Sequence, residues 1–381
     1  MPPNRRGIIG FVSRIAKIFL PAIPAAPLLT AAASRTFQQA TPLETVSETT
    51  ANASLGDLNG DGHLDIVLAK GRHWPLADVV LFGDGKGHFR PGPPLPNQPD
   101  RSYSAPLADL NGDGSLDIVI SNDRPDAKII LLNDGRGNFR SGGTFGDPNW
   151  STRNVALGDL DGNGSPDIAV ANRPGPAQIC FNDGKARFSC RPLGPETSST
   201  ILIGDMNGDG AQDVVVPCRD NCQSVIYFND GKGDFPRKLP FGPSGSSTRA
   251  IAIADFNGDG YPDIAACHEE TGLYVYFNDG KGNFGPGVMI SGKEALPYSM
   301  IAADLNRDGK QDIVVGYVEA PGAIYFNDGS GRKYTRVPFG DNKGAIYGMA
   351  AGDLDGDGFP DLVVARSDAP SLIFFSKPGL K

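Results

Sequence analysis

Short apolar segments rich in Val, Ile and Leu recur along the chain and are separated by clusters of Asp, Asn and Gly. In one unit, four such segments follow one another at 102–110, 116–122, 127–133 and 138–142. β-Branched residues favour strands, whereas Asp, Asn and Gly favour the turns between them. No long helical period is visible. The pattern therefore predicts units of four short antiparallel strands and an all-β fold.

A nine-residue acidic segment joins the first two strands of every unit and occurs seven times. The first copy is DLNGDGHLD, and the copies start at Asp57, Asp109, Asp159, Asp205, Asp255, Asp304 and Asp353. We call these segments the first to seventh acidic loops. They start 46 to 52 residues apart, a period typical of propellers, solenoids or arrays. Seven units of four antiparallel strands predict a seven-bladed β-propeller.

A second turn, NDGRG or a close variant, joins the third strand of a unit to the fourth. It starts at Gly83, Asn133, Asn182, Asn229, Asn278 and Asn327. Phe89, Phe139, Phe235 and Phe284 begin fourth strands, and each lies 20 residues before the next acidic loop, as Phe37 does. The seventh unit ends without a fourth strand of its own. We therefore expect 37–40 to supply the outer strand of the last blade and to close the ring.

Each acidic loop carries oxygen side chains at its first, third, fifth and ninth positions and glycine at its sixth. Hard oxygen ligands on a tight turn are typical of calcium, whereas magnesium keeps more of its water. The twelfth position is apolar, for example Leu68 and Ile120, so these are not helix-loop-helix calcium sites. A simple β-turn is the alternative, but it does not require the ninth oxygen.

We therefore predict up to seven calcium ions with a structural role. The predicted ligands are Asp57, Asn59, Asp61, Asp65, Asp109, Asn111, Asp113, Asp117, Asp159, Asp161, Asn163, Asp167, Asp205, Asn207, Asp209, Asp213, Asp255, Asn257, Asp259, Asp263, Asp304, Asn306, Asp308, Asp312, Asp353, Asp355, Asp357 and Asp361. Asn163 replaces a carboxylate, and Arg307 replaces the fourth-position glycine of the sixth loop. We expect the third and sixth loops to be the weakest sites.

The charge of the chain is consistent with metal binding. The formal net charge is −9, and 22 of the 44 acidic residues lie in the acidic loops. The acidity therefore belongs to the predicted metal sites and does not form an acidic tail. The sequence has no basic stripe, which argues against a nucleic-acid partner.

Residues 1–33 differ in composition from the rest of the chain. Arg5, Arg6, Arg14 and Lys17 precede the mostly apolar run 18–33, and the segment contains no acid. This pattern is typical of a secretory signal peptide. The run is shorter than the roughly 20 residues of a membrane span, although an uncleaved anchor is the alternative. We expect residues 34–381 to form one exported propeller that is secreted, periplasmic or on the cell surface, and membrane-bound only if the segment is retained.

An oxidising compartment permits disulfide bonds. Cys218 and Cys222 flank a short turn, and Cys180 and Cys190 flank a predicted hairpin. Both pairs are candidate disulfides. Cys267 would remain as a buried thiol.

One residue per unit is predicted to face the central channel. The residues six positions before the acidic loops are Ala51, Tyr103, Arg153, Ser199, Arg249, Tyr298 and Tyr347. They would ring the mouth of the channel on the face opposite the acidic loops. Tyr103, Arg153, Arg249, Tyr298 and Tyr347 form a candidate binding site for a sugar, a glycan or an acidic small molecule. Alternatively, they plug the channel or pack between blades.

Two smaller features on the same face remain open. Trp74 and Trp150 are the two tryptophans and would either contact a partner or cover blade edges. His268, Glu269 and Glu270 could act as an acid–base cluster, although neighbouring residues in one turn also describe a solvated loop.

The D-x-[ND]-x-[DN]-G-x-x-D loops and their NDGxGxF companions resemble the FG-GAP or VCBS repeats of secreted bacterial proteins, and the loops resemble those of the integrin α-subunit propeller. The resemblance covers Phe37 to the C-terminus. It implies a calcium-binding β-propeller used for adhesion or for matrix or carbohydrate contact. We expect a monomeric binding module, without catalytic activity, for a glycan or an extracellular protein. The alternative is a polysaccharide lyase or hydrolase on the same scaffold.

Overall fold

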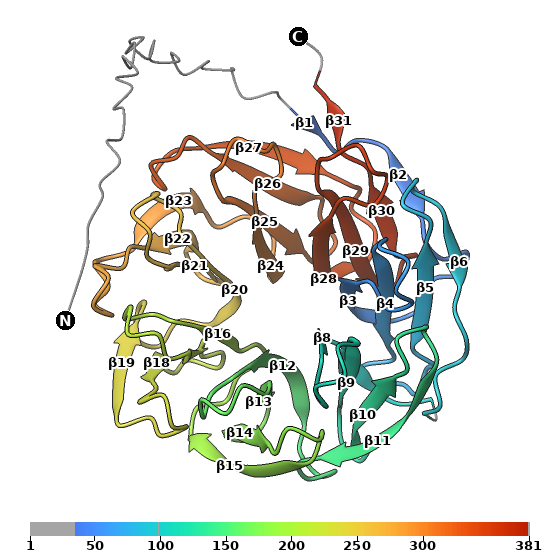
Figure 1. Ribbon diagram of the computed structural model, residues 1–381. Helices are drawn as coiled ribbons and strands as arrows, with labels where there is room; N and C mark the ends of the chain where they lie inside the picture. The colour runs from blue at the N-terminus through green and yellow to red at the C-terminus, as the bar shows by residue number, and fades with distance from the viewer. Residues whose placement is uncertain (1–34, 98, 380–381) are drawn as a thin grey trace, which may run out of the picture. The chain divides into compact units, whose positions relative to one another are not determined.

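The computed structural model describes residues 35–97 and 99–379. These residues form strands and turns, with no helix among them. Figure 1 shows seven sheets arranged as blades around a central axis. Within each blade, neighbouring strands are antiparallel. The predicted seven-bladed β-propeller is therefore confirmed.

The strands follow the predicted units. The first blade contains β3 (Thr50–Gly56), β4 (Asp65–Lys70), β5 (Val79–Gly83) and β6 (Phe89–Pro91). The second contains β7 (Ser102–Ser104) and β8 (Leu107–Ala108) as two pieces of its inner strand, then β9 (Asp117–Asn122), β10 (Lys128–Asn133) and β11 (Phe139–Phe145). The third contains β12 (Thr152–Gly158), β13 (Asp167–Asn172), β14 (Ala177–Asn182) and β15 (Phe188–Gly194).

The remaining blades repeat this order. The fourth contains β16 (Leu202–Gly204), β17 (Asp213–Val216), β18 (Ser224–Phe228) and β19 (Arg237–Phe241). The fifth contains β20 (Thr248–Ala254), β21 (Asp263–His268), β22 (Gly272–Tyr276) and β23 (Val288–Gly292). The sixth contains β24 (Pro297–Ala303), β25 (Asp312–Tyr317), β26 (Gly322–Asn327) and β27 (Tyr334–Phe339). The seventh contains β28 (Ala345–Gly352), β29 (Asp361–Ser367), β30 (Leu372–Phe374) and, from the other end of the chain, β2 (Ala40–Pro42).

The hydrophobic core lies between neighbouring blades. The second strand of a blade is buried along its whole length, as in β9. Val119 of the second blade packs in one cluster with Val155 and Ile168 of the third. A strand covered on both faces needs apolar side chains on both. This explains why the second strands have continuous apolar runs without alternation.

The two ends of the described chain close the ring, as predicted, but with a shifted register. β2 pairs with β30 through Ala40 and Phe374, and Pro42 lies opposite Leu372. The closing strand therefore begins three residues later than predicted. Phe37 is fully buried between the sixth and seventh blades, against Phe339 and Phe374. It anchors the chain before the strand starts.

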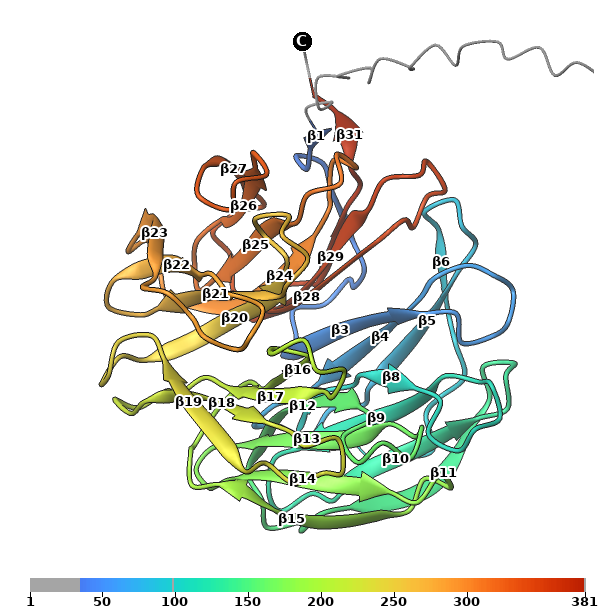
Figure 2. The same ribbon diagram turned by 60° about the vertical axis from the view of Figure 1, so that its left-hand side comes forward.

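A second contact between the chain ends extends beyond the seventh blade. β1 (Arg35–Thr36) pairs with β31 (Lys377–Pro378) to form a two-stranded ribbon. Figure 2 shows this ribbon standing at the edge of the ring. We call it the terminal ribbon. The predicted signal peptide, 1–33, lies outside the described residues, and the described part of the chain has no helix long and apolar enough to span a membrane.

Both candidate disulfides are present. Cys180 on β14 lies directly opposite Cys190 on β15, and the two are bonded. Cys218 and Cys222 are bonded across the loop after β17. Cys267 is a buried free thiol, and burial raises its pKa above the usual range. The three predictions about cysteine are therefore confirmed.

Candidate calcium loops and central cavity

The acidic loops are held in shape by their own carboxylates. In the first loop, Asp57 Oδ1 accepts a hydrogen bond from the amide of Gly60 at 2.8 Å, and its Oδ2 accepts one from Gly62 at 2.8 Å. Asn59 Oδ1 accepts a bond from the Asp61 amide at 2.9 Å. Gly60 and Gly62 have φ values of 76° and 82°, where a Cβ would be strained. These hydrogen bonds and the two glycines therefore fix the shape of the loop.

The ninth-position aspartate joins the acidic loop to the third strand. Asp65 is fully buried; its Oδ2 accepts a hydrogen bond from the amide of Leu58 at 2.8 Å, and its Oδ1 one from Gly83 at 2.9 Å. Burial raises the pKa of this carboxyl in every blade, to about 7 for Asp213 and Asp312. The neighbouring carboxylates of the loop raise it further. A cation beside these groups would favour their ionised forms.

In two of the acidic loops the spacing of the carboxylate oxygens fits one hard cation each. Carboxylate oxygens of Asp159, Asp161 and Asp167 lie within 4.8 Å of one another, and so do those of the seventh-loop residues Asp353, Asp355 and Asp361. Calcium binds oxygens at about 2.3–2.6 Å, so atoms on opposite sides of one ion would have this separation. In the other five loops an asparagine replaces the third-position carboxylate and can contribute an amide oxygen.

The third and sixth loops keep the common shape despite their substitutions. Asn163 Oδ1 accepts a bond from the Ser165 amide at 2.7 Å, and its Nδ2 donates to the carbonyl of Asn182 at 2.9 Å. Arg307 adopts φ 55°, which costs an L-residue roughly 1–2 kcal/mol. Lys310 lies 3.5 Å from Asp308. The sixth loop therefore has both backbone strain and a competing cation.

The seventh loop has the most carboxylates and also the closest cations. Lys377 Nζ lies 2.7 Å from Asp355 Oδ2, and Arg35 Nη2 lies 3.1 Å from Asp357 Oδ2. Both cations belong to the terminal ribbon. Sequence reasoning did not place this loop among the weak sites, because both pairs depend on where the terminal ribbon lies, and Arg35 and Asp357 come from opposite ends of the chain.

The asparagine that opens the NDGxG turn connects neighbouring blades, a role that sequence reasoning missed. Asn133 Nδ2 donates to the carbonyl of Leu58, in the acidic loop of the preceding blade, at 2.8 Å. The contact recurs from Asn182, Asn229, Asn278 and Asn327 to the second residue of the preceding acidic loop. The recurrence of Asn, where a turn accepts several residues, was the available signal. The acidic loops are therefore linked from blade to blade.

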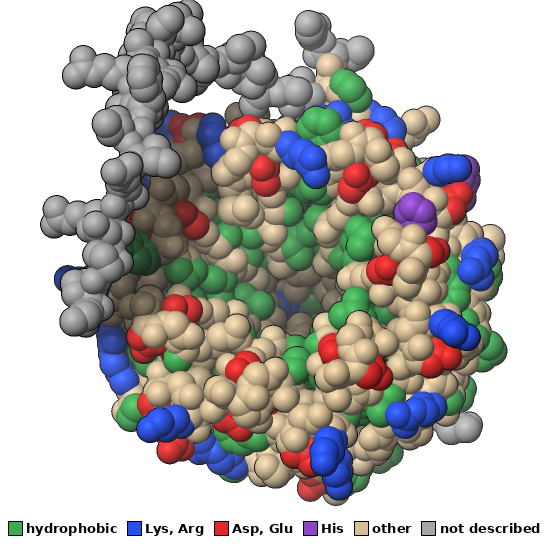
Figure 3. Space-filling view, viewed as in Figure 1, with side chains coloured by type: hydrophobic (Ala, Val, Ile, Leu, Met, Phe, Trp, Pro, Cys, Tyr) green, Lys and Arg blue, Asp and Glu red, His purple; other side chains and the backbone are tan. Residues whose placement is uncertain are grey.

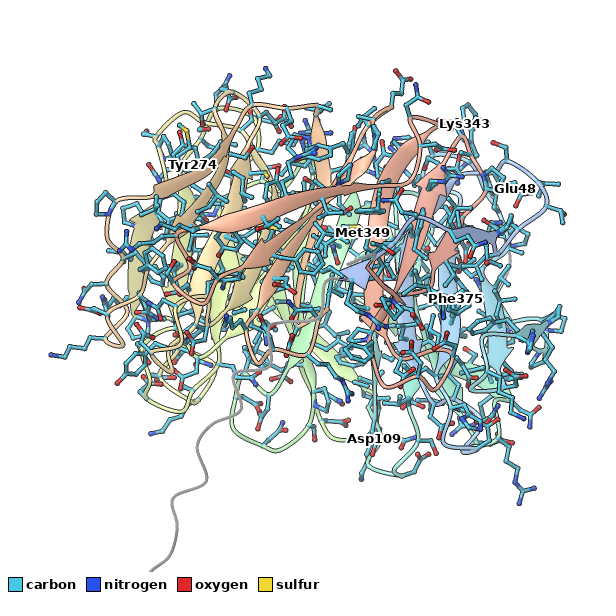
Figure 4. All side chains as sticks on the ribbon, turned by 90° about the horizontal axis from the view of Figure 1, so that it is seen from above. Glu48, Asp109, Tyr274, Lys343, Met349 and Phe375 are labelled. Atoms are coloured by element: carbon cyan, nitrogen blue, oxygen red, sulfur yellow. A yellow bond between two sulfur atoms is a disulfide. The ribbon has the colours of Figure 1, made fainter. Side chains whose placement is uncertain are left out.

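The two faces of the propeller are distinct. Figure 4 shows Asp109, of the second acidic loop, at one face and Glu48 and Lys343 at the opposite one. Figure 3 views the acidic-loop face and shows acidic side chains around a hollow at the centre of the ring.

A cavity of about 360 Å³ lies on the propeller axis. All seven residues predicted to face the channel line it, namely Ala51, Tyr103, Arg153, Ser199, Arg249, Tyr298 and Tyr347. Arg72, His73, Arg173 and Arg219, from the loops after the second strands, line it as well. We call this space the central cavity. The structure therefore brings these seven residues together at one cavity, and it adds Arg173 and Arg219, which sequence reasoning did not place there.

Arginine and tyrosine side chains follow one another around the central cavity in a series of contacts that we call the stack, in which the Tyr298 and Tyr347 rings are tilted by 54°. The guanidinium of Arg153 lies 4.5 Å from the Tyr103 ring centroid, and that of Arg72 lies 5.8 Å from the same ring. Arg72 also lies 3.5 Å from the ring of Tyr347, whose centroid is 4.2 Å from that of Tyr298. Arg249 ends the stack, 3.8 Å from Tyr298. The stack spans six blades, and Arg72 occupies the place that the small Ala51 leaves open.

Positive charge exceeds negative charge at the central cavity. Three arginines have close carboxylate partners, in the pairs Arg153–Asp123 at 2.7 Å, Arg173–Asp220 at 2.6 Å and Arg249–Glu269 at 2.9 Å. Arg219 shares Glu269 at 3.5 Å. Among the described residues, the Arg72 side chain has no ion pair, and it donates a hydrogen bond to Ser367 Oγ at 3.3 Å. Five arginines therefore face three carboxylates.

The proposed acid–base cluster does not converge on one point. His268 is 1 % exposed, with Thr248 Oγ1 2.8 Å from its Nδ1 and Tyr276 Oη 2.7 Å from its Nε2. Glu269 pairs with Arg249, and Glu270 accepts a hydrogen bond from Ser246 Oγ at 2.7 Å. The reading of this turn as a solvated loop was wrong for His268, which ends a buried strand.

Burial lowers the pKa of His268 to about 4. A lowered folded-state pKa gives stability that is complete above the unfolded value of about 6.5 and is lost as the pH falls toward 4. We expect His268→Gln to remove on the order of 2–3 kcal/mol of pH-dependent stability between these limits. Urea unfolding of both proteins at pH 7 and pH 5 measures this. Equal pH dependence in the two proteins would contradict a neutral, buried His268.

The two tryptophans have different environments. Trp74 is 69 % exposed, two residues beyond Arg72 of the central cavity. Trp150 packs against the core cluster that contains Phe145 and Val155. Trp74 is therefore available to a partner, whereas Trp150 covers the edge of a blade.

Comparison with known proteins agrees with this architecture. Solved structures of similar fold include a lectin of Agrocybe aegerita that recognises non-reducing terminal N-acetylglucosamine, with 21 % identity, a TM-score of 0.57, and coverage of 77 % of this chain and 80 % of the lectin. Two structures of BBS1N in complex with ARL6DN have 12 % and 14 % identity, TM-scores of 0.59 and 0.57, and coverage of 90 % and 91 % of this chain and 97 % of theirs. At these identities the likeness shows the fold alone.

No curated protein matches the chain in sequence. The model of the FG-GAP-like repeat matches six times, at 57–120, 109–170, 159–216, 205–266, 255–315 and 304–364. Each match runs from one acidic loop into the second strand of the next blade. The chain therefore belongs to the FG-GAP-like repeat family.

Proposed function

We propose that this protein is an exported, calcium-binding β-propeller that binds a glycan or an extracellular protein on the face opposite the acidic loops. The central cavity carries this proposal, because a ring of tyrosines and arginines lines it and exposed Trp74 directly follows His73 of its lining in the sequence. The lectin and BBS1N show that propellers of this fold bind a sugar and a protein partner, respectively. The composition of 1–33 supports export.

Calcium in the acidic loops would stabilise the frame that presents this face. An ion there supplies positive charge to three or four carboxylates that otherwise repel one another. The ninth-position aspartate connects each loop to the third strand, and the NDGxG asparagine connects the loop to the next blade. Through these contacts, five of the acidic loops are hydrogen-bonded to the following blade.

The ligand can be sought with glycan and matrix-protein arrays probed with the full chain in calcium. We expect a ligand whose binding is lost in the double variant Arg153→Ala/Tyr298→Ala. Arg237→Ala is a matched control, because its guanidinium also lies on an aromatic ring, 4.1 Å from Phe228, and it does not line the cavity. Unchanged binding by the double variant would place the site elsewhere, and the absence of any ligand would contradict the proposal.

Competition at the seventh loop can be measured separately. Removing the charge of Lys377 leaves Asp355 free to bind an ion. We expect Lys377→Gln to bind calcium at one site roughly twofold to fivefold more tightly, the equivalent of one exposed ion pair. Competition with a chromophoric chelator measures this, and Lys232→Gln, an exposed lysine of the fourth blade, is the control. Identical titrations of both variants would contradict the competition.

A further inference from the structure

The tyrosine faces of the central cavity are already occupied. Tyr347 has Arg72 at 3.5 Å and Tyr298 at 4.2 Å, while Tyr298 has Arg249 at 3.8 Å. Tyr103 lies between Arg153 and Arg72. These rings are therefore not free platforms on which a sugar could stack. Their role is to hold guanidinium groups in place through cation–π contact.

A guanidinium held over an aromatic ring can still bind an oxyanion through the N–H groups that have no other partner. Two guanidinium donors, Arg72 Nε and Arg249 Nη1, are buried without a hydrogen bond among the described residues, and so is the hydroxyl of Ser199. Arg249 is only 4 % exposed. A buried donor without a partner costs free energy that an incoming acceptor would recover.

The other polar side chains that line the central cavity are also hydrogen-bond donors or uncharged. Burial raises the pKa of Tyr103 and Tyr347, so their hydroxyls stay protonated. His73 has a lowered pKa and is therefore neutral near pH 7. Asn52, Asn154 and Thr200 line the same space with uncharged polar side chains. The cavity thus combines surplus positive charge with groups suited to hydroxyls.

From these observations we propose that the central cavity binds the oxyanion of an acidic saccharide, either a carboxylate or a sulfate carried on a sugar ring, through Arg72 and Arg249. The choice of a saccharide rests on the proposed function, whereas the anion follows from the guanidinium stack and its unpaired donors. At about 360 Å³, the cavity is near the lower end of small-ligand sites, which span roughly 300–1,000 Å³. It therefore suits the end of a glycan better than an extended chain segment.

Calorimetry on the full chain in calcium tests this with two matched pairs of probes. The first pair is a galacturonate trisaccharide and its methyl ester, and the second is a sulfated disaccharide and its desulfated form. At least one acidic probe is expected to bind at least tenfold more tightly than its neutral form. Its binding should weaken at least tenfold in Arg72→Gln and in Arg249→Gln, and should not change in Arg237→Gln.

Arg72→Gln carries the test if Arg249→Gln fails to fold, because Arg249 pairs with Glu269 whereas Arg72 has no ion pair among the described residues. Equal binding of acidic and neutral probes, or full binding by folded Arg72→Gln, would overturn the inference. If neutral glycans bind and neither acid does, the inference fails and the proposed function stands. If no glycan or matrix protein binds at all, both fail.

Discussion

In EDTA the protein is expected to melt roughly 10 °C or more below its melting temperature in millimolar calcium, because each ion bound only to the folded state adds to stability. Removing the ions would leave 22 carboxylates in seven tight loops with their mutual repulsion uncompensated. Differential scanning calorimetry in EDTA, then after excess calcium, measures the effect.

Magnesium is the control for this melting experiment. Because it demands octahedral geometry and keeps several waters, it should restore only part of the lost melting temperature. A melting curve unaffected by EDTA and by calcium would show that the acidic loops act as turns alone.

Asp213→Ala is expected to destabilise the protein by about 3–5 kcal/mol even without metal, because it leaves buried backbone donors unpaired. Asp213 is fully buried and accepts hydrogen bonds from the amides of Met206 and Asn229, at 2.9 and 2.8 Å. Urea unfolding in EDTA measures this loss separately from any contribution of calcium.

Asp209→Ala in the same loop is the matched control. Asp209 is exposed and accepts a bond from the Ala211 amide at 2.8 Å. In EDTA this variant should lose less than about 1 kcal/mol of folding stability. In calcium it should also lose the stability that the Asp209 carboxylate adds as a calcium ligand. Equal losses for the two variants in EDTA would contradict the structural role of the ninth position.

The fold and the positions of the cavity residues could be predicted because the repeat fixes both. A constant offset from each acidic loop places Tyr103 and Arg249 at equivalent points of their blades. A correct strand assignment for one blade therefore gives the position of the equivalent residue in every blade. Arg72 could not be predicted in this way. It lies in a loop whose length and sequence differ from blade to blade, and only the packing of side chains brings it onto Tyr347.

The partners in contacts between blades, or between the two ends of the chain, could not be predicted from the sequence either. The recurrence of Asn in the NDGxG turns was visible in the sequence, but the backbone carbonyls that these side chains bind were not. Arg35 and Asp357 meet only because the ring closes. Closure itself was predictable from the missing fourth strand, but its register was not, since the burial of Phe37 and the terminal ribbon together set where β2 begins.

The central claim is that calcium binds in the acidic loops of the blades and stabilises the ring that presents the central cavity. Its most direct test is an anomalous difference map from a crystal grown in calcium. The account predicts peaks about 2.3–2.6 Å from the oxygens of the first, third, fifth and ninth positions, strongest in the first, second, fourth and fifth loops, where neither a substitution nor a competing cation intervenes. A map without peaks in these four loops would contradict it.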